Sequence, residues 1–116
     1  MNKRKVGSIW EDKAAKYLEE RGYKIICRNF YTYFGEVDII ARDGDTMAFI
    51  EVKYRAGSQM GIPEEAVDIK KQKRIYKSAQ YYMYKYFGGA NIPCRFDVVA
   101  IFKNQIRLYK NAFGGI

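Results

Sequence analysis

The chain of 116 residues is 48% hydrophobic and 29% charged, which favours one folded domain over residues 1–116 and excludes a disordered tail or a fibre. It contains no histidine and only two cysteines, which excludes a structural zinc site. No apolar stretch approaches the roughly 18 residues needed to cross a bilayer. The formal net charge of +8 favours a polyanionic partner, with nucleic acid ahead of an anionic membrane.

The two cysteines, Cys27 and Cys94, each lie inside an apolar run. Residues 1–5 are basic and precede an amphipathic stretch, so they predict no secretory signal. The spacing of the cysteines permits a disulfide, but we interpret both as reduced core thiols of a cytoplasmic protein.

The first predicted elements are a helix and a strand. Ser8 and Glu11 match a capping-box pattern, and apolar residues then recur at helical spacing, which predicts a helix over residues 9–21. Residues 23–30 are rich in β-formers and predict a strand, which residues 33–35 follow as a bend.

A β-hairpin is predicted next. Two apolar-rich segments, residues 36–42 and 46–54, flank an Asp-Gly-Asp sequence at 43–45 that is typical of a tight turn. The Gly, Ser and Pro residues of segment 57–63 then predict a loop.

The last third of the chain predicts a helix and two strands. Apolar residues at three- and four-residue steps predict a helix over residues 68–87, and strands follow over 94–102 and 105–109. The whole order predicts an α/β fold in which a central mixed sheet is flanked by two helices.

Four charged residues on the hairpin share a pattern. Glu36 and Asp38 lie on one face of the first strand, and Glu51 and Lys53 lie on one face of the second. A two-residue loop at 44–45, or a four-residue loop, opposes Asp38 to Glu51, and a two-residue loop one position earlier opposes Glu36 to Glu51. A three-residue loop would separate the two pairs onto opposite faces.

Three carboxylates on one apolar patch are costly to keep ionised without a cation. Oxygen ligands without His or Cys select Mg²⁺ or Mn²⁺, and such an ion supplies the two needs of phosphodiester hydrolysis, a polarised phosphoryl oxygen and a more acidic water. Lys53, two residues after Glu51, is placed to orient that water or to neutralise charge on the phosphate.

Asp38, twelve intervening residues and then Glu51-Val52-Lys53 resemble the signature of the PD-(D/E)XK nuclease superfamily, whose members share the restriction-endonuclease fold. The whole chain resembles the small bacterial YraN-type proteins, a group similar to archaeal Holliday-junction resolvases. The matching stretches are Glu11 with Ala14, Ala15, Tyr17 and Leu18, then Gly35-Glu36-Val37-Asp38, Phe49-Ile50-Glu51-Val52-Lys53, Lys71-Gln72, Arg95-Phe96-Asp97-Val98 and Asn111-Ala112-Phe113.

The resemblance implies a restriction-endonuclease-like fold with Asp38 and Glu51 as metal ligands and Lys53 as the catalytic lysine. It also implies that Glu11 reaches the metal site from the first helix. We assign Glu36 to the same catalytic group, with an exposed strand charge as the alternative. By analogy with resolvases, the protein is expected to act as a homodimer, because a branched junction needs two symmetric cuts.

Plainer interpretations stand beside these assignments. The hairpin charges could form a solvated face with a cross-strand ion pair worth at most about 1 kcal/mol, and Glu11 could simply cap its helix. Residues 69–96 hold seven Lys or Arg and no Asp or Glu. The basic residues predicted to contact nucleic-acid phosphates, with a solvated helix face as the alternative, are Lys70, Lys71, Lys73, Arg74 and Lys77.

Most of the eleven Tyr and seven Phe recur at core spacing, as Tyr82 and Tyr86 do. The aromatic residues near the bend are the exceptions, and they are candidates for stacking on bases: Tyr31, Tyr33 and Phe34. Asp97 lies in an apolar strand and is interpreted as a buried, hydrogen-bonded structural acid.

The leading hypothesis is a Mg²⁺- or Mn²⁺-dependent endonuclease that hydrolyses phosphodiester bonds in DNA, with branched or junction DNA as a candidate substrate. The alternative is a non-catalytic nucleic-acid-binding protein that retains the nuclease fold. A domain that binds an anionic membrane or an acidic protein is supported by charge alone.

Overall fold

The computed structural model describes residues 3–55, 67–102 and 105–114. The predicted loop over 57–63 lies outside these ranges. The helices and strands follow the predicted order: α1 (Lys3–Glu20), β1 (Lys24–Thr32), β2 (Gly35–Asp43), β3 (Thr46–Arg55), α3 (Ile69–Phe87), β4 (Cys94–Phe102) and β5 (Gln105–Tyr109).

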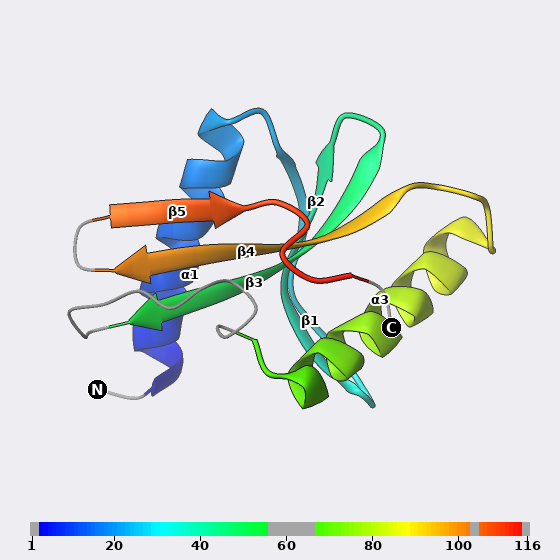
Figure 1. Cartoon of the computed structure of the whole chain (residues 1–116), viewed down its shortest axis with the longest axis horizontal. Coiled ribbons are helices and arrows are strands. Elements are labelled where there is room, and N and C mark those ends of the chain that lie inside the picture. The colour runs from blue at the N-terminus through cyan, green and yellow to red at the C-terminus, as the bar shows by residue number, and fades with distance from the viewer. Residues whose placement is uncertain (1–2, 56–66, 103–104, 115–116) are drawn as a thin grey trace.

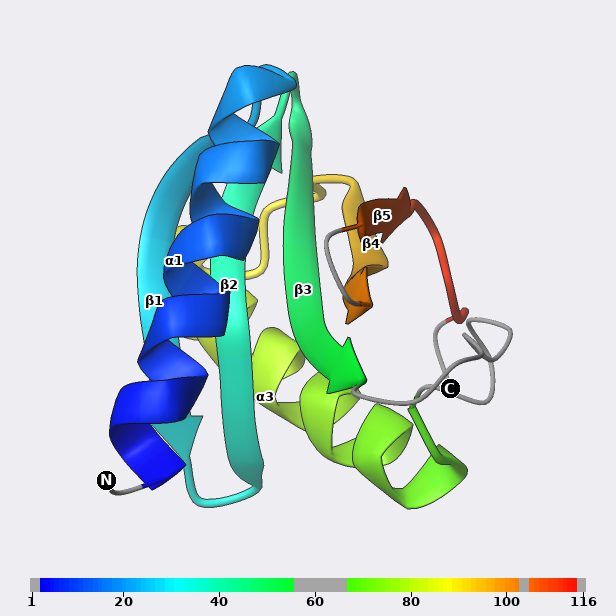
Figure 2. The ribbon, with the colours of Figure 1, turned by 90° about the vertical axis from the view of Figure 1, so that its left-hand side faces the viewer.

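The strands form one five-stranded sheet in the order β1-β2-β3-β4-β5. The β3–β4 pair is parallel and the other neighbouring pairs are antiparallel, so the sheet is mixed. A parallel pair needs a crossover connection, and α3 lies in it. Figures 1 and 2 show α1 and α3 on opposite faces of the sheet. The predicted α/β architecture is confirmed and is consistent with a restriction-endonuclease-like fold.

Each helix packs against a separate hydrophobic cluster on its own face of the sheet. Leu18 of α1 belongs to the layer that contains Ile50, whereas Ile75 of α3 belongs to the layer that contains Phe49. Successive residues of β3 therefore point to opposite faces, as strand geometry requires. The same alternation directs Glu51 toward the side of the sheet that α3 covers.

The β2–β3 turn decides how the hairpin charges meet. Asp43 pairs with Thr46, which leaves a two-residue loop whose first residue, Gly44, has a φ of 62°. This left-handed conformation is favourable for glycine. The loop at 44–45 is thus the first of the predicted alternatives, and one further step of the register would oppose Asp38 to Glu51.

The two helices differ in how well their starts were predicted. α3 begins as expected, with Asp68 accepting a hydrogen bond from the Lys71 N–H at 2.9 Å, and it ends at Gly88 with a φ of 59°. α1 begins at Lys3, so Ser8 lies within the helix and the capping-box prediction is wrong. Basic residues at the start of α1 are good helix formers, and they extend the helix past the expected cap.

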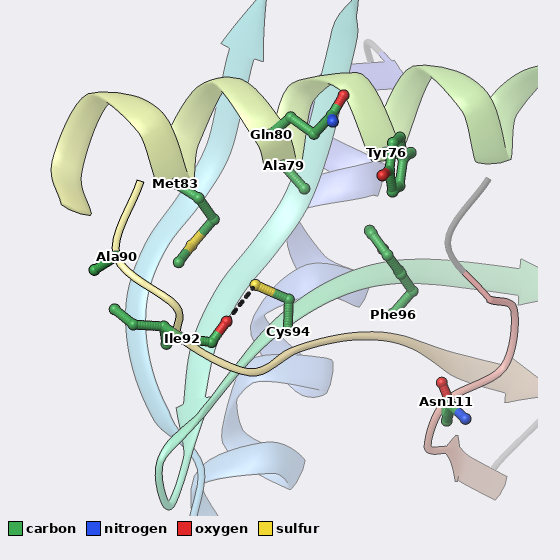
Figure 3. Close-up of a pocket in the computed structure, with 9 residues that line it drawn as sticks. All are labelled: Tyr76, Ala79, Gln80, Met83, Ala90, Ile92, Cys94, Phe96 and Asn111. Atoms are coloured by element: carbon green, nitrogen blue, oxygen red, sulfur yellow. Dashed lines mark hydrogen bonds between the residues drawn. The ribbon is translucent and has the colours of Figure 1, made fainter. Parts of the chain in front are cut away.

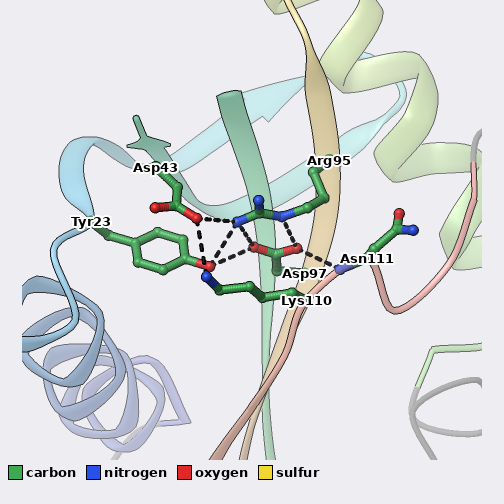
Figure 4. A network of polar contacts seen from close by, with 6 residues as sticks. All are labelled: Tyr23, Asp43, Arg95, Asp97, Lys110 and Asn111. Carbon is green, nitrogen blue, oxygen red and sulfur yellow. Dashed lines mark hydrogen bonds and ion pairs between the residues drawn. The ribbon is translucent and has the colours of Figure 1, made fainter. Parts of the chain in front are cut away.

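A buried polar network fixes one end of the sheet (Figure 4). Asp97 has no exposed surface, and it accepts hydrogen bonds from the Tyr23 hydroxyl at 2.9 Å and from the Asn111 N–H at 2.8 Å. The Arg95 guanidinium bonds both Asp97 and Asp43. The network joins the residue before β1, the end of β2, β4 and the segment after β5, which confirms Asp97 as a structural acid.

Two expected core assignments are wrong. Cys94 is exposed because it opens β4 at the edge of the packed layer, whereas Cys27 is partly buried, and both are free thiols. Tyr82 is buried as predicted, but Tyr86 is exposed, with its ring centroid 4.7 Å from that of Tyr82. Within the described ranges, no helix is both long and apolar enough to span a membrane.

Candidate functional site

The candidate site lies where β2 and β3 part. Their ladder runs from Asp43 and Thr46 to Ile39 and Ile50. Beyond it, Oδ2 of Asp38 accepts the Val52 N–H at 2.8 Å, so a side chain takes a bond that a strand carbonyl would otherwise accept. A hollow of about 290 Å³ lies here, and its lining residues are Trp10, Glu11, Asp38, Glu51, Val52, Lys53, Tyr54 and Lys71.

Three half-buried carboxylates gather at this place. Oxygen atoms of Glu11, Glu36 and Asp38 all lie within 4.8 Å of one another. Glu11 comes from α1, and the other two come from alternate positions of β2. Carboxylates this close repel one another, and hard cations such as Mg²⁺ bind to oxygen groups of this kind.

Arg28 of β1 compensates part of this negative charge. Its Nε lies 3.4 Å from Glu11, and its terminal nitrogen lies 2.7 Å from Asp12. Burial and the neighbouring Asp38 nevertheless raise the pKa of Glu11 above its usual value, while Arg28 opposes them. The sequence did not indicate Arg28, because its contact depends on how β1 and α1 pack. Glu11 therefore faces the hollow and an arginine, and is not a helix cap.

Glu51 is the most buried charged group of the hollow, with 3% of its surface exposed. Its Oε1 bonds the Lys71 ammonium at 2.8 Å, whereas its buried Oε2 has no hydrogen-bond partner within the described part of the chain. Burial, followed by repulsion from Asp38, raises the pKa of Glu51 to about 8. A buried carboxylate oxygen without a partner, beside three further carboxylates, fits a hard divalent cation.

Lys71 differs from its neighbours on α3. It was predicted to contact phosphates, but its side chain is directed to Glu51 in the hollow. The four other predicted residues are exposed, as contact with a large polyanion would require: Lys70, Lys73, Arg74 and Lys77. The position of Lys71 could be foreseen only from the rotation of α3 against the sheet.

One wall of the hollow is aromatic, and Lys53 lies beside it. The rings of Trp10 and Tyr54 stack with their centroids 4.0 Å apart, which connects α1 to the end of β3. Lys53 is half-buried and lines the same hollow. The structure thus brings Lys53 together with the carboxylates predicted from the sequence. The stacked aromatic rings shield one side of the hollow from water.

A second hollow, of about 360 Å³, lies between α3 and the start of β4 (Figure 3). The residues that line it include Met83, Ile92 and Phe96, and none of its described lining residues is acidic or basic. Cys94 is also there, with its Sγ 3.4 Å from the Ile92 carbonyl oxygen. Since none of the described lining residues of this hollow could hold a metal ion through a carboxylate, the better candidate is the hollow lined by Glu11, Asp38 and Glu51, which we call the acidic hollow.

The fold and the acidic hollow define a small α/β protein with a candidate metal site. Comparison with known proteins assigns the chain to a family: the model of uncharacterised protein family UPF0102 matches residues 10–101. A UPF0102 protein of Lachnoclostridium phytofermentans is 49% identical over 113 residues, which cover 97% of this chain and 96% of the relative.

Two further relatives extend this similarity. A UPF0102 protein of Caldicellulosiruptor saccharolyticus is 42% identical over 119 residues, covering 97% of this chain and 100% of the relative. A UPF0102 protein of Persephonella marina is 44% identical over 108 residues, covering 92% and 91%. The chain therefore belongs to the UPF0102 family.

Proposed function

We propose that this protein is a metal-dependent endonuclease of the PD-(D/E)XK superfamily that hydrolyses phosphodiester bonds in DNA, with branched DNA as the first substrate to test. The observation that carries the proposal is the buried Oε2 of Glu51, which finds no hydrogen-bond partner in residues 3–55, 67–102 and 105–114. It adjoins the three clustered carboxylates and Lys53. A structural role alone would leave this buried oxygen without a hydrogen-bond partner among the residues that the structure describes.

The residues have distinct roles under this proposal. Asp38 and Glu51 hold Mg²⁺ or Mn²⁺, with Glu11 and Glu36 as the further carboxylates of the group. When bound, the cation polarises a phosphoryl oxygen and lowers the pKa of water. The Asp38 carboxylate is held in place by the Val52 N–H. Lys53 donates hydrogen bonds to the phosphoryl oxygen on which negative charge develops.

Cleavage of a labelled four-way junction tests the proposal, with linear duplex and single strand as further substrates in Mg²⁺, Mn²⁺ or chelator. We expect metal-dependent cutting that Lys53→Ala reduces by about 100-fold or more, because removing one transition-state donor typically costs that much. Asp38→Asn should also abolish cutting. Lys16→Ala, an exposed lysine of α1, is the matched control. Equal cutting by wild type and Lys53→Ala would refute the assignment of the site.

A non-catalytic nucleic-acid-binding protein is the second candidate. It is favoured by the two ion pairs of the hollow, Arg28 with Glu11 and Lys71 with Glu51, which neutralise carboxylates without a cation. Trp10 is the single tryptophan and lines the hollow, so its fluorescence should report metal binding. Saturable quenching by Mn²⁺ that Glu51→Gln abolishes supports the nuclease, whereas DNA binding without any response to Mn²⁺ supports the binder.

Partners and location complete the proposal. DNA is the partner that the net charge of +8 favours, and two copies would be needed for symmetric cuts of a junction. Sedimentation of the protein with junction DNA in chelator distinguishes one bound copy from two. The free thiols of Cys27 and Cys94 are compatible with action in the reducing cytoplasm.

A further inference from the structure

Four aromatic residues and Thr32 line a third hollow, of about 350 Å³, at the β1–β2 turn. We refer to the four aromatic residues as the aromatic platform, which consists of Tyr31, Tyr33, Phe34 and Tyr81. Tyr33 is 98% exposed and Tyr31 is 61% exposed, so the core does not require these rings. The volume lies within the range of about 300–1,000 Å³ that is usual for ligand pockets.

The turn that carries the platform is anchored on α3. The Thr32 hydroxyl accepts hydrogen bonds from the N–H groups of Phe34 and Gly35, at 3.0 and 3.2 Å. The same hydroxyl lies 2.7 Å from the hydroxyl of Ser78, which has no exposed surface. The rings of Tyr33 and Phe34 are therefore mounted on a fixed turn, which reduces the entropy that a ligand would have to overcome.

Cationic side chains of α3 border the platform. The Lys77 ammonium lies 5.7 Å from the centre of the Phe34 ring, and the Lys85 ammonium lies 5.9 Å from that of Tyr81. Arg74 borders the turn as well, since a Cβ at Gly35 would lie 3.4 Å from its Cβ. Flat rings interleaved with cations are complementary to a strand that carries bases and phosphates. An anionic membrane would need the cations but not rings around a hollow.

The platform adjoins the cluster of three carboxylates. Tyr31 of β1 pairs directly with Glu36 of β2, which is one of the three clustered carboxylates. Side chains of directly opposed residues start about 4.5–5.5 Å apart on the same face of a strand pair. A base on the platform would thus lie next to the place where the proposed function puts the phosphodiester bond.

We propose that the aromatic platform binds unpaired bases of a nucleic-acid strand by stacking, while the exposed cations of α3 contact its phosphates. This inference rests on the proposed function and deepens it, because it names a strand with unpaired bases as the substrate class. Binding of the bases needs no cation and can be measured without cleavage.

Fluorescence anisotropy in chelator tests the inference with two labelled strands of equal length, an oligothymidylate and an abasic strand with the same phosphates. We expect Tyr31→Ala and Tyr33→Ala each to weaken oligothymidylate binding about 5- to 100-fold, the usual effect of removing one stacking ring. Their affinity for the abasic strand should stay unchanged, and Tyr33→Trp should retain affinity for both strands. Tyr84→Ala is the matched control, since Tyr84 is 76% exposed on α3 but does not line the hollow.

Equal affinity of wild type for the two strands would overturn the inference, as would equal losses in Tyr33→Ala and Tyr84→Ala. The absence of any oligonucleotide binding would also overturn it, and the platform would then be tested as a protein-binding surface. The proposed function fails separately. If wild type never cuts in Mg²⁺ or Mn²⁺ but binds bases through Tyr31 and Tyr33, the nuclease is refuted and the platform stands.

Discussion

Glu51 carries a carboxyl group into the interior beside a second carboxylate. Its pKa is raised from 4.5 to about 8, chiefly by burial and then by Asp38. At pH values between 4.5 and about 8, Glu51 is therefore protonated in the folded protein but ionised in the unfolded chain. The unfolded state then binds fewer protons, so the stability of the metal-free protein must fall as pH rises from about 4.5 to 8.

Glu51→Gln should remove most of this pH dependence. The amide cannot ionise, so in chelator at pH 8 we expect the variant to be more stable than wild type by about 1–3 kcal/mol, because a buried polar group without a partner costs more when it is charged than when it is neutral. At pH 5 the two proteins should be nearly equal. Urea unfolding midpoints at the two pH values provide the measurement.

Glu19→Gln is the control for this effect, because Glu19 is exposed on α1. It should behave like wild type at both pH values. Added Mg²⁺ should restore the stability of wild type at pH 8 and leave Glu51→Gln unchanged. A wild-type midpoint that is independent of pH in chelator would contradict this account of Glu51.

Helix α3 presents two different sets of cations. Lys71 is turned inward, where burial lowers the pKa of its ammonium group, but the bond to Glu51 and the neighbouring carboxylates together raise that pKa above its usual value. Lys70, Lys73 and Lys77 are exposed and free to approach a phosphate backbone. Helix α3 therefore places one cation inside the acidic hollow and three others on the protein surface.

This division predicts different salt dependences for duplex DNA binding. Each phosphate contact that is lost should reduce the slope of log K against log salt by about 0.9. We expect Lys70→Ala and Lys73→Ala each to show this reduction in chelator. Lys71→Ala should leave the slope near that of wild type, because this ammonium is engaged by Glu51. Lys16→Ala on α1 is the control, and an equal reduction in all four variants would contradict a specific role for α3.

Elements whose limits are set locally could be predicted from the sequence. The Asp68 cap, the Gly88 stop and the two-residue turn at Gly44 each depend on a few neighbouring residues. The turn also fixes the parity of β2 and β3, so the proximity of Asp38 and Glu51 follows from local rules. For this reason the mixed sheet and the carboxylates of the candidate site could be predicted from the sequence.

Contacts that depend on helix docking could not be predicted in this way. The pairing of Arg28 with Glu11 requires the position of α1 on β1, and that of Lys71 with Glu51 requires the rotation of α3. The capping-box pattern was misleading, because the same residue types also occur inside a helix that starts earlier. Sequence spacing specifies which residues share a face, but not which partner from another element meets them.

The two ends of β2 have different tasks in the molecule. At the Asp43 end, the polar network of Figure 4 joins Tyr23, just before β1, to β2, β4 and the segment after β5. At the other end, Glu36 and Asp38 belong to the carboxylate cluster with Glu11, and Asp38 lines the acidic hollow. Stability and the proposed chemistry are thus separated along a single strand, and a change in the network should leave the hollow intact.

Tyr23→Phe tests this separation. The variant loses the hydroxyl that donates to Asp97 and accepts from Arg95, at 2.9 and 2.8 Å. Because Asp97 keeps its bonds to Arg95, we expect a loss of only about 1–2 kcal/mol in the free energy of unfolding, measured with urea at pH 7. Tyr84→Phe, which alters an exposed hydroxyl on α3, should cost nothing measurable. Metal-dependent cleavage by folded Tyr23→Phe should equal that of wild type, and a large loss of cleavage with little loss of stability would show that the two ends of β2 are coupled.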